Sequence, residues 1–109
     1  LQVDLRIDRE EQLSLLTNQP ASTVEMSICY LDIEGNDHCG ENAYRRMFTT
    51  RHAKGDDRLV RVRRGEWFRF EEDLMTLDPR PRVLNSMAIS GGVNAGREAW
   101  IRRIRVGTN

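Results

Sequence analysis

Apolar and polar residues alternate along the first eight residues of the chain, "LQVDLRID". Successive side chains of an extended chain point to opposite faces. One face therefore carries only apolar side chains, namely Leu1, Val3, Leu5 and Ile7. A period of two over this length predicts a β-strand with one side buried in a core.

The same period recurs in residues 23–33, "TVEMSICYLDI". The apolar face of this second predicted strand carries Val24, Met26, Ile28 and Tyr30. The residues "EGND" that follow are typical of a turn. Residues 43–50, "AYRRMFTT", are then predicted to return as the partner strand of a hairpin.

Short segments of the same kind, separated by glycine, proline and acidic turns, continue to the end of the chain. Further strands are predicted at residues 12–17, 58–64, 65–74, 83–92 and 99–106, with Leu84, Met87 and Ile89 as candidate core residues. Two prolines make residues 75–82, "MTLDPRPR", irregular. No long window shows the apolar spacing of a helix. The sequence therefore predicts an all-β sandwich of about eight antiparallel strands in two packed sheets.

A length of 109 residues fits one domain, residues 1–109, with a core of its own. The chain begins with Leu1 rather than methionine, so we interpret it as either a mature form or a segment excised from a larger protein. Other domains of that parent protein are therefore expected partners. No run approaches the roughly 18 apolar residues of a membrane span, so this segment is not expected to insert into a bilayer.

Seventeen basic residues are balanced by seventeen acidic ones. A net charge of zero argues against a dedicated nucleic-acid binder, which normally carries a net positive field. All basic residues except Lys54 are arginine. This bias has two interpretations: the codon usage of a GC-rich genome, or a surface that recognises anions, since the guanidinium fork suits carboxylates and sulfates.

Two pairs of arginines alternate with apolar residues and are predicted to lie on the outer faces of strands. They are Arg61 and Arg63 in one segment, and Arg103 and Arg105 in the last one. If the two strands are neighbours, the pairs form a basic patch that binds an acidic ligand. The alternative is two solvated faces with local ion pairs.

Cys29 and Cys39 lie on either side of the "EGND" turn. A hairpin would bring them within disulfide range in an oxidising compartment. The alternative is that Cys29 is a small core residue. Their spacing does not match a zinc site, and His38 beside Cys39 is interpreted as a solvated turn residue.

Several short patterns in the second half of the chain are similar to one family. Gly65, Trp67, Asp73 and Leu74 fall in "RGEWFRFEEDL", and Trp100, Ile101, Ile104 and Val106 fall in "AWIRRIRV". With "VLNSMAIS" between them, and with "VDLRI" and "CYLDIEG" upstream, this order resembles the galactose-binding-like jelly roll of carbohydrate-binding modules. The resemblance implies a jelly-roll sandwich that binds a glycan without catalysing a reaction.

One departure from this family bears on cofactors. Where many of its members place an aspartate that ligates a structural calcium ion, this chain has Arg102. An arginine there removes an oxygen ligand and adds a repelling charge. Neither a metal nor another cofactor is therefore expected.

Candidate ligand-contacting and catalytic residues are few. The seven aromatic side chains are needed to fill two inner faces, so Trp67 and Trp100 are interpreted as core or core-edge residues, with a ligand platform as the alternative. Tyr44 is the best remaining candidate for an exposed platform. The acidic run 71–73 lies on one strand end, whereas glycoside hydrolysis needs two acids about 5–9.5 Å apart across a cleft. No catalytic residues are identified.

These observations favour a non-catalytic module that binds a glycan or polysaccharide, with arginine contacts if the glycan is acidic. Its expected ligand-binding residues are Tyr44, Trp67, Arg61, Arg63, Arg103 and Arg105. The expected location is extracellular, periplasmic or on the cell surface. The alternative is a protein-interaction or assembly domain on the same fold, with no sugar ligand. A small hydrolase is a third and weaker interpretation, because no catalytic constellation supports it.

Overall fold

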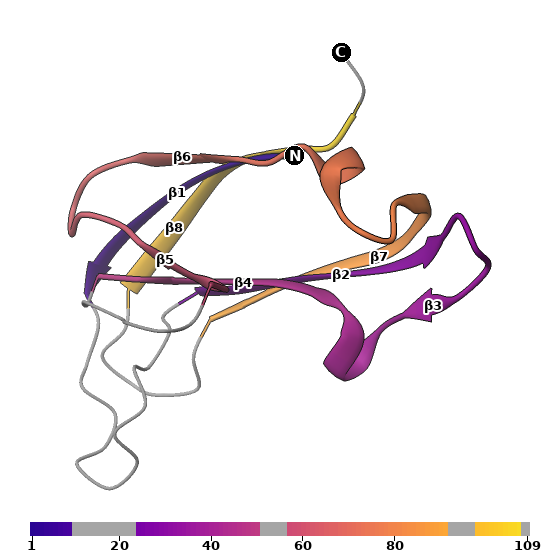
Figure 1. Cartoon of the computed structure of the whole chain (residues 1–109). Coiled ribbons are helices and arrows are strands. Elements are labelled where there is room, and N and C mark those ends of the chain that lie inside the picture. Colours follow the sequence, from indigo (N-terminus) through magenta and orange to yellow (C-terminus); the bar gives the residue numbers. More distant parts are fainter. Residues whose placement is uncertain (10–23, 51–56, 92–97, 108–109) are drawn as a thin grey trace, which may run out of the picture.

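The computed structural model of the chain describes residues 1–9, 24–50, 57–91 and 98–107. Within these ranges it contains strands and two short 3₁₀ turns, and no α-helix (Figure 1). The strands are β1 (Gln2–Arg9), β2 (Val24–Asp32), β3 (Asp37–His38), β4 (Tyr44–Thr49), β5 (Leu59–Arg61), β6 (Phe68–Glu71), β7 (Pro81–Gly91) and β8 (Glu98–Arg105). The turns are η1 (Gly40–Asn42) and η2 (Leu74–Thr76).

Two sheets pack against each other (Figure 1). Sheet A has the order β6-β1-β8, and both of its strand pairs are antiparallel. In sheet B, β2 pairs with β7 along one edge and with β3 and β4 along the other, and β5 lies beyond β4. The all-β sandwich predicted from the sequence is therefore confirmed. The jelly-roll connectivity implied by the resemblance stays a prediction.

One strand pair departs from the expected antiparallel arrangement. β5 runs parallel to β4, with Phe48 opposite Val60. The chain leaves β5 towards the end of β1, where the amide of Gly65 donates a hydrogen bond to the carbonyl of Ile7 (2.9 Å). Because β5 runs parallel to β4, its end lies on the side where the chain crosses from sheet B to sheet A.

The core lies between β1 and β2, the central strands of their sheets. Their inward side chains are almost fully buried, and they are Val3, Leu5 and Ile7 of β1, and Val24, Met26, Ile28 and Tyr30 of β2. Phe48 of β4 completes the centre and contacts Phe70 of β6 edge-on, with ring centroids 5.3 Å apart. The period of two in both predicted strands is therefore confirmed.

The edge strand β7 is only partly covered. Met87 and Ile89 pack against the core as predicted, but Leu84 is 40% exposed, so its assignment to the core is wrong. Leu84 sits beyond a register shift in the β2–β7 pair, where the edge strand leaves the cover of sheet A. The strand predicted at residues 12–17 lies outside the described residues.

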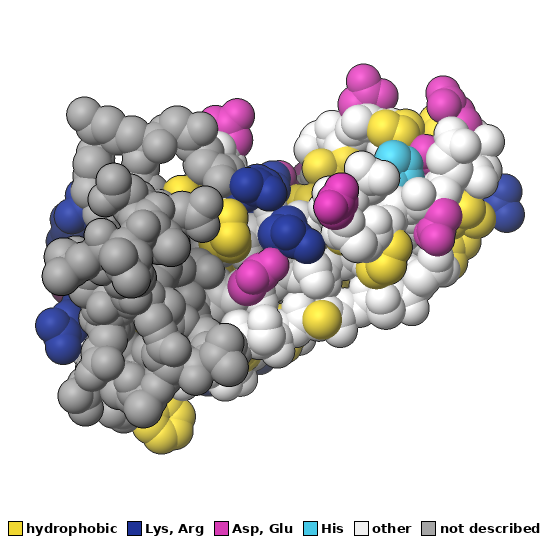
Figure 2. All heavy atoms as spheres, turned by 90° about the horizontal axis from the view of Figure 1, so that it is seen from below, with side chains coloured by type: hydrophobic (Ala, Val, Ile, Leu, Met, Phe, Trp, Pro, Cys, Tyr) yellow, Lys and Arg dark blue, Asp and Glu magenta, His cyan; other side chains and the backbone are white. Residues whose placement is uncertain are grey.

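The outer face of sheet B carries charges of both signs. Seen from below, basic and acidic side chains lie close together on it, with single apolar side chains between them (Figure 2). One such pair joins Arg45 and Glu25 at 3.1 Å between neighbouring strands. This mixture is typical of a solvated face. No helix in the described part of the chain is long and apolar enough to cross a bilayer.

The turn after β2 is built around Asp32, whose side chain is fully buried. Its carboxylate accepts hydrogen bonds from the backbone amides of Glu34 (2.8 Å) and Asn36 (2.9 Å), and lies 2.6 Å from Nε2 of His38. Burial disfavours the charged form, but these hydrogen bonds outweigh it and hold the pKa of Asp32 below its ordinary value. The predicted turn is confirmed. His38 stacks on Tyr30 and packs against the turn, so its interpretation as a solvated residue is wrong.

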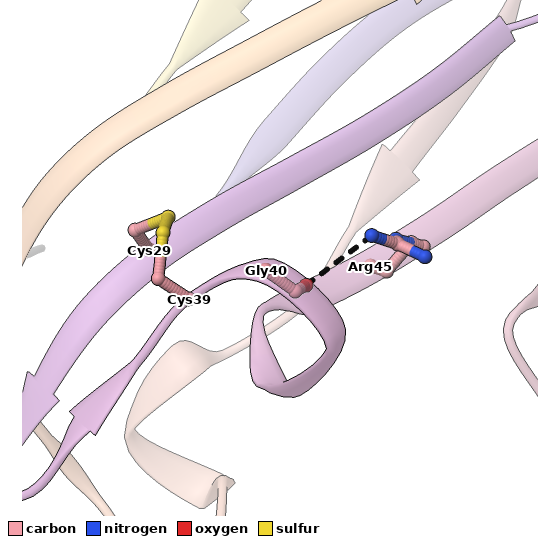
Figure 3. The surroundings of a disulfide bond; sticks show 4 residues. All are labelled: Cys29, Cys39, Gly40 and Arg45. Carbon is pink, nitrogen blue, oxygen red and sulfur yellow. Dashed lines mark hydrogen bonds between the residues drawn. A yellow bond between two sulfur atoms is a disulfide. The ribbon is translucent and has the colours of Figure 1, made fainter.

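Cys29 of β2 and Cys39 after β3 form a disulfide, with their Cα atoms 4.6 Å apart (Figure 3). The hairpin disulfide predicted from the sequence is confirmed. The bond ties β3 and the start of η1 to β2, and Arg45 donates a further hydrogen bond to the Gly40 carbonyl (3.3 Å). Such a bond is compatible with an oxidising compartment.

Replacing both cysteines (Cys29→Ser with Cys39→Ser) is expected to lower the free energy of unfolding by up to about 3 kcal/mol, because the short cross-linked loop restricts the unfolded chain. Urea unfolding of the parent and the variant measures this difference. Reducing the parent with dithiothreitol should produce the same loss. An unchanged midpoint in both experiments would show that the bond contributes nothing to stability.

Candidate functional site

Two tryptophans are exposed on the outer face of sheet A. Trp67, just before β6, is 40% exposed, and Trp100 of β8 is 50% exposed. Because Val3, Leu5 and Ile7 point inward, the residues between them on β1 point outward, and Trp100 lies opposite the outward Arg6. The interpretation of the two tryptophans as core residues is therefore wrong. Phe68 and Phe70 take the inward positions of β6 instead.

Asp8 holds the Trp100 end of this face. Its carboxylate accepts a hydrogen bond from Nε1 of Trp100 (3.0 Å). It also pairs with the guanidinium of Arg6, two nitrogens of which lie 2.9 and 3.0 Å from its oxygens. The backbone carbonyl of Asp8 also accepts a hydrogen bond from Nε of Arg64 (2.7 Å). One carboxylate therefore fixes both the indole of β8 and the arginine of β1.

Two guanidinium groups lie over the Trp67 ring. The guanidinium carbon of Arg102 is 4.3 Å from the ring centroid, and that of Arg6 is 5.1 Å from it. Both are within the range of cation–π attraction. Arg102 reaches the outer face because the β1–β8 register shifts at this point, with Asp4 opposite Arg103 and Leu5 opposite Ile101.

Asp4 lies beneath the guanidinium groups and is almost fully buried, although it points to the outer face. Arg69 of β6 binds its carboxylate with two nitrogens, at 2.8 and 3.3 Å, and a nitrogen of Arg102 lies 3.5 Å from it. The hydrogen bonds from Arg69 lower the pKa of Asp4. Burial raises it, and the charges of Arg69 and Arg102 lower it further, so the pKa stays below its ordinary value.

We call this set the tryptophan–arginine surface; it consists of Asp4, Arg6, Asp8, Trp67, Arg69, Trp100 and Arg102. It offers apolar indole area, guanidinium donors and carboxylate acceptors on one sheet face. Its charged groups are held by one another, so their positions are fixed before a ligand arrives. Arg103 and Arg105 of β8 lie beside it, and each is exposed, with no ion pair among the described residues.

The two predicted arginine pairs are not brought together. Arg61 and Arg63 line a hollow with Thr50, Val62 and Arg64 at the end of β5, an edge strand of sheet B. Arg103 and Arg105 belong to β8, an edge strand of sheet A, and Arg105 lines a different hollow with Glu71 and Glu72. The single basic patch is therefore ruled out, because the strands belong to different sheets.

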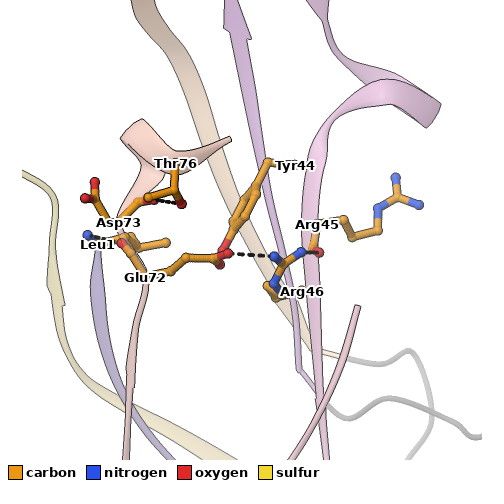
Figure 4. A network of polar contacts seen from close by, with 7 residues as sticks. All are labelled: Leu1, Tyr44, Arg45, Arg46, Glu72, Asp73 and Thr76. Atoms are coloured by element: carbon orange, nitrogen blue, oxygen red, sulfur yellow. Dashed lines mark hydrogen bonds and ion pairs between the residues drawn. The ribbon is translucent and has the colours of Figure 1, made fainter. Parts of the chain in front are cut away.

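Tyr44 is buried, so its assignment as an exposed platform is wrong. Its hydroxyl donates a hydrogen bond to Glu72, its ring lies under the Arg46 guanidinium at 4.5 Å, and Arg46 pairs with Glu72 at 2.8 Å (Figure 4). Burial, and secondarily the hydrogen bond to Glu72, raises the pKa of the Tyr44 hydroxyl. Tyr44 thus ties β4 of sheet B to the segment after β6.

The acidic run 71–73 has structural partners. Glu72 binds Tyr44 and Arg46, and Asp73 accepts a hydrogen bond from the amide of Met75 (3.0 Å) at the start of η2. Across the described residues, no three His, Cys, Asp or Glu side chains gather as a metal site requires. Arg102, at the position where the resemblance implies a calcium ligand, contacts Trp67 and Asp4 instead.

Asp4, Arg6, Asp8 and Arg69 were not predicted as site residues, although the period of two placed the first three on the polar face of the first strand. The alternation of "VDLRID" does place its polar residues on the outer face, which was an available signal. The register shift that turns Arg102 outward has no local signal, because an arginine pair in "WIRRIR" is compatible with an uninterrupted strand.

Acid is expected to destabilise the protein as the pH falls below about 3.8, the ordinary pKa of Asp4. Because the pKa of Asp4 is lower in the folded protein than in the unfolded chain, the charged carboxylate stabilises the fold at a pH above the unfolded-state pKa. This stabilisation is lost as the pH falls through the folded-state pKa. Asp4→Asn should lose less stability than the parent when the pH falls below about 3.8. Arg69→Gln should also lose less stability in acid, and it should be less stable than the parent at neutral pH. Urea unfolding at about pH 7 and about pH 3 measures both. An Asp4→Asn variant as acid-sensitive as the parent would contradict the assignment.

The chain shows no significant similarity to a known protein family, to a characterised protein or to a solved structure. The likeness to galactose-binding-like domains therefore stays a prediction. The tryptophan–arginine surface has to be interpreted from its own geometry and chemistry.

Proposed function

We propose that this domain is a non-catalytic glycan-binding module, and that its ligand lies across the tryptophan–arginine surface. The observation that carries the proposal is the exposure of Trp67 and Trp100 on one sheet face, with fixed arginines and aspartates between them. Exposed indoles on the outer face are not needed for the core, which is filled without them. Clustered aromatic side chains with fixed polar neighbours are typical of binding surfaces.

The chemistry of this surface suits an extended sugar chain. An indole face packs on the apolar side of a pyranose, and guanidinium and carboxylate groups hydrogen-bond to hydroxyls. Trp100 is held at its Nε1 by Asp8, so its ring orientation is set in advance. The exposed Arg103 and Arg105 add donors that favour carboxylate or sulfate groups, so acidic glycans are the ligand class that we favour over neutral ones.

Location is part of the same proposal. The Cys29–Cys39 bond supports an exported protein, since disulfides persist in oxidising compartments. The resemblance to carbohydrate-binding modules supports extracellular, periplasmic or cell-surface placement within a larger protein. The zero net charge remains an argument against nucleic acid as the ligand.

A protein-binding role is the second candidate, and a specific observation favours it. Ile101 and Ile104 of β8 are 41% and 46% exposed, at the open edge of sheet A. Exposed apolar side chains on a sheet edge are typical of protein contacts. The two roles use different parts of sheet A, its outer face and its edge.

Trp100→Ala and Trp67→Ala are each expected to weaken glycan binding about tenfold or more, as truncation of a central aromatic contact does. Titration calorimetry with dextran sulfate, polygalacturonate and neutral dextran measures the affinity. Ile33→Ala, at a side chain 51% exposed in the turn after β2, is the control and should bind like the parent. Because Trp67 is exposed, its variant should lose less than the roughly 3–5 kcal/mol of a core aromatic. Tryptophan variants that bind every glycan as tightly as the parent would refute the proposed surface.

Binding of the acidic glycans should weaken steeply between about 0.1 and 1 M salt, since the Debye length falls from about 10 to about 3 Å. Arg103→Ala should flatten this dependence, because its guanidinium is exposed and unpaired among the described residues. Arg82→Ala, an exposed arginine on β7, is the matched control and should leave the slope unchanged. Salt-independent binding, or neutral glycans preferred over acidic ones, would remove the arginines from the proposed site.

A further inference from the structure

β8 is an open edge strand of eight residues. Among the described residues it pairs with β1 alone, over Glu98–Arg105. The other outer strands are less open: β3, β5 and β6 have only 2, 3 and 4 residues. β7 begins at Pro81, which cannot donate a hydrogen bond to another strand.

The inner side of β8 is also uncovered. Ile104 lies opposite Val3 and Ile101 lies opposite Leu5, so the isoleucines face the core side of sheet A. Val3 and Leu5 are 1% and 0% exposed, whereas Ile104 and Ile101 are 46% and 41% exposed. Sheet B therefore covers the centre of sheet A but not this edge. An apolar strip next to an unpaired strand edge fits another β-strand.

We propose that the strand that pairs with β8 is β8 of a second copy of this chain. The two strands run antiparallel about a two-fold axis near the middle of β8 and join two copies of sheet A into one six-stranded sheet. In this register Ala99 of one copy lies opposite Ile104 of the other, and Trp100 lies opposite Arg103. A contact of this kind is isologous and closed, so it yields a dimer and no filament.

The register shift in β8 is what makes the strand complementary to itself. It puts Ala99 and Ile104 on the inner face and Trp100 and Arg103 on the outer face, although each pair is separated by an odd number of positions. In an uninterrupted strand such pairs would lie on opposite faces. With Arg102 as the extra residue of each strand, Ala99, Ile101 and Ile104 of one copy meet Ile104, Ile101 and Ala99 of the other on the inner face, and Trp100 meets Arg103 on the outer face.

Charge supports the second copy over a general apolar peptide. Three arginines on one strand would repel a like strand in most registers. In the proposed register Arg103 meets an indole of the other copy and no guanidinium. Each molecule already contains this type of contact, between Arg102 and Trp67 at 4.3 Å. If the proposed function holds, the dimer also places two tryptophan–arginine surfaces on one continuous sheet face.

Sedimentation velocity over a concentration series tests the association. The parent should be a dimer that dissociates on dilution, and Ile104→Lys should be a monomer because it puts a charge in the inner seam. Val83→Lys is the matched control: Val83 is 43% exposed on the edge strand of the other sheet, and its variant should dimerise like the parent. A parent that is monomeric up to millimolar concentration overturns the proposal. Equal loss of association in both variants overturns it too.

Cross-linking tests the register and does not depend on the folding of a lysine variant. In Ala99→Cys with Ile104→Cys, the two new thiols are about 16 Å apart along one strand and cannot bond within it. Oxidation should therefore give a covalent dimer, and either single variant should stay uncross-linked, because its thiol faces no thiol. Circular dichroism confirms that the variants remain folded. A dimer that gives no cross-link overturns the β8 pairing. The cross-linking result does not depend on glycan binding, so the dimer proposal can fail while the proposed function holds, and the reverse.

Discussion

The packing of β1 against β2 is the constraint on which the rest of the structure depends. Each is the central strand of its sheet, and the inward side chains of both are almost completely removed from water. Burial of such a side chain contributes roughly 1.5–3 kcal/mol. A slip of one residue in β1 would exchange its two faces and expose the entire apolar set. The core therefore fixes which side chains the outer face of sheet A presents.

Three aspartates organise the polar parts of the molecule, and two of them, Asp4 and Asp32, are buried. Asp4 draws in arginines from β6 and β8, Asp8 binds Arg6 and Trp100, and Asp32 closes the turn after β2. A buried carboxylate without partners is costly, so Asp4 dictates the placement of Arg69, which is distant in sequence. The tryptophan–arginine surface follows from this requirement, since its guanidinium groups are held by the two aspartates of β1. Stability and the candidate binding chemistry thus rest on the same contacts.

Sheet B does not cover the β8 edge of sheet A, where Ile101 and Ile104 are exposed. The outer face of sheet A and the edge along β8 point in different directions, so a glycan on the face and a protein strand at the edge approach from different sides. Trp100 and Arg103 of β8 belong to both regions. The proposed ligand and the proposed second copy would therefore influence each other through these two side chains.

The sequence by itself determined most of the strands, the buried faces of β1 and β2, the turn after β2 and the disulfide. These features depend on periodicity and on residues close in the chain, which are visible without a structure. Tertiary structure alone decided which strands are neighbours, and this separated Arg61 and Arg63 from Arg103 and Arg105. It also decided the burial of Tyr44 and the exposure of Trp67. Aromatic residues fit either a core or a surface, and the choice depends on which other side chains fill the interior first. Here Phe48, Phe68 and Phe70 occupy the inner faces, which leaves the indoles outside beside the arginines of β1 and β8.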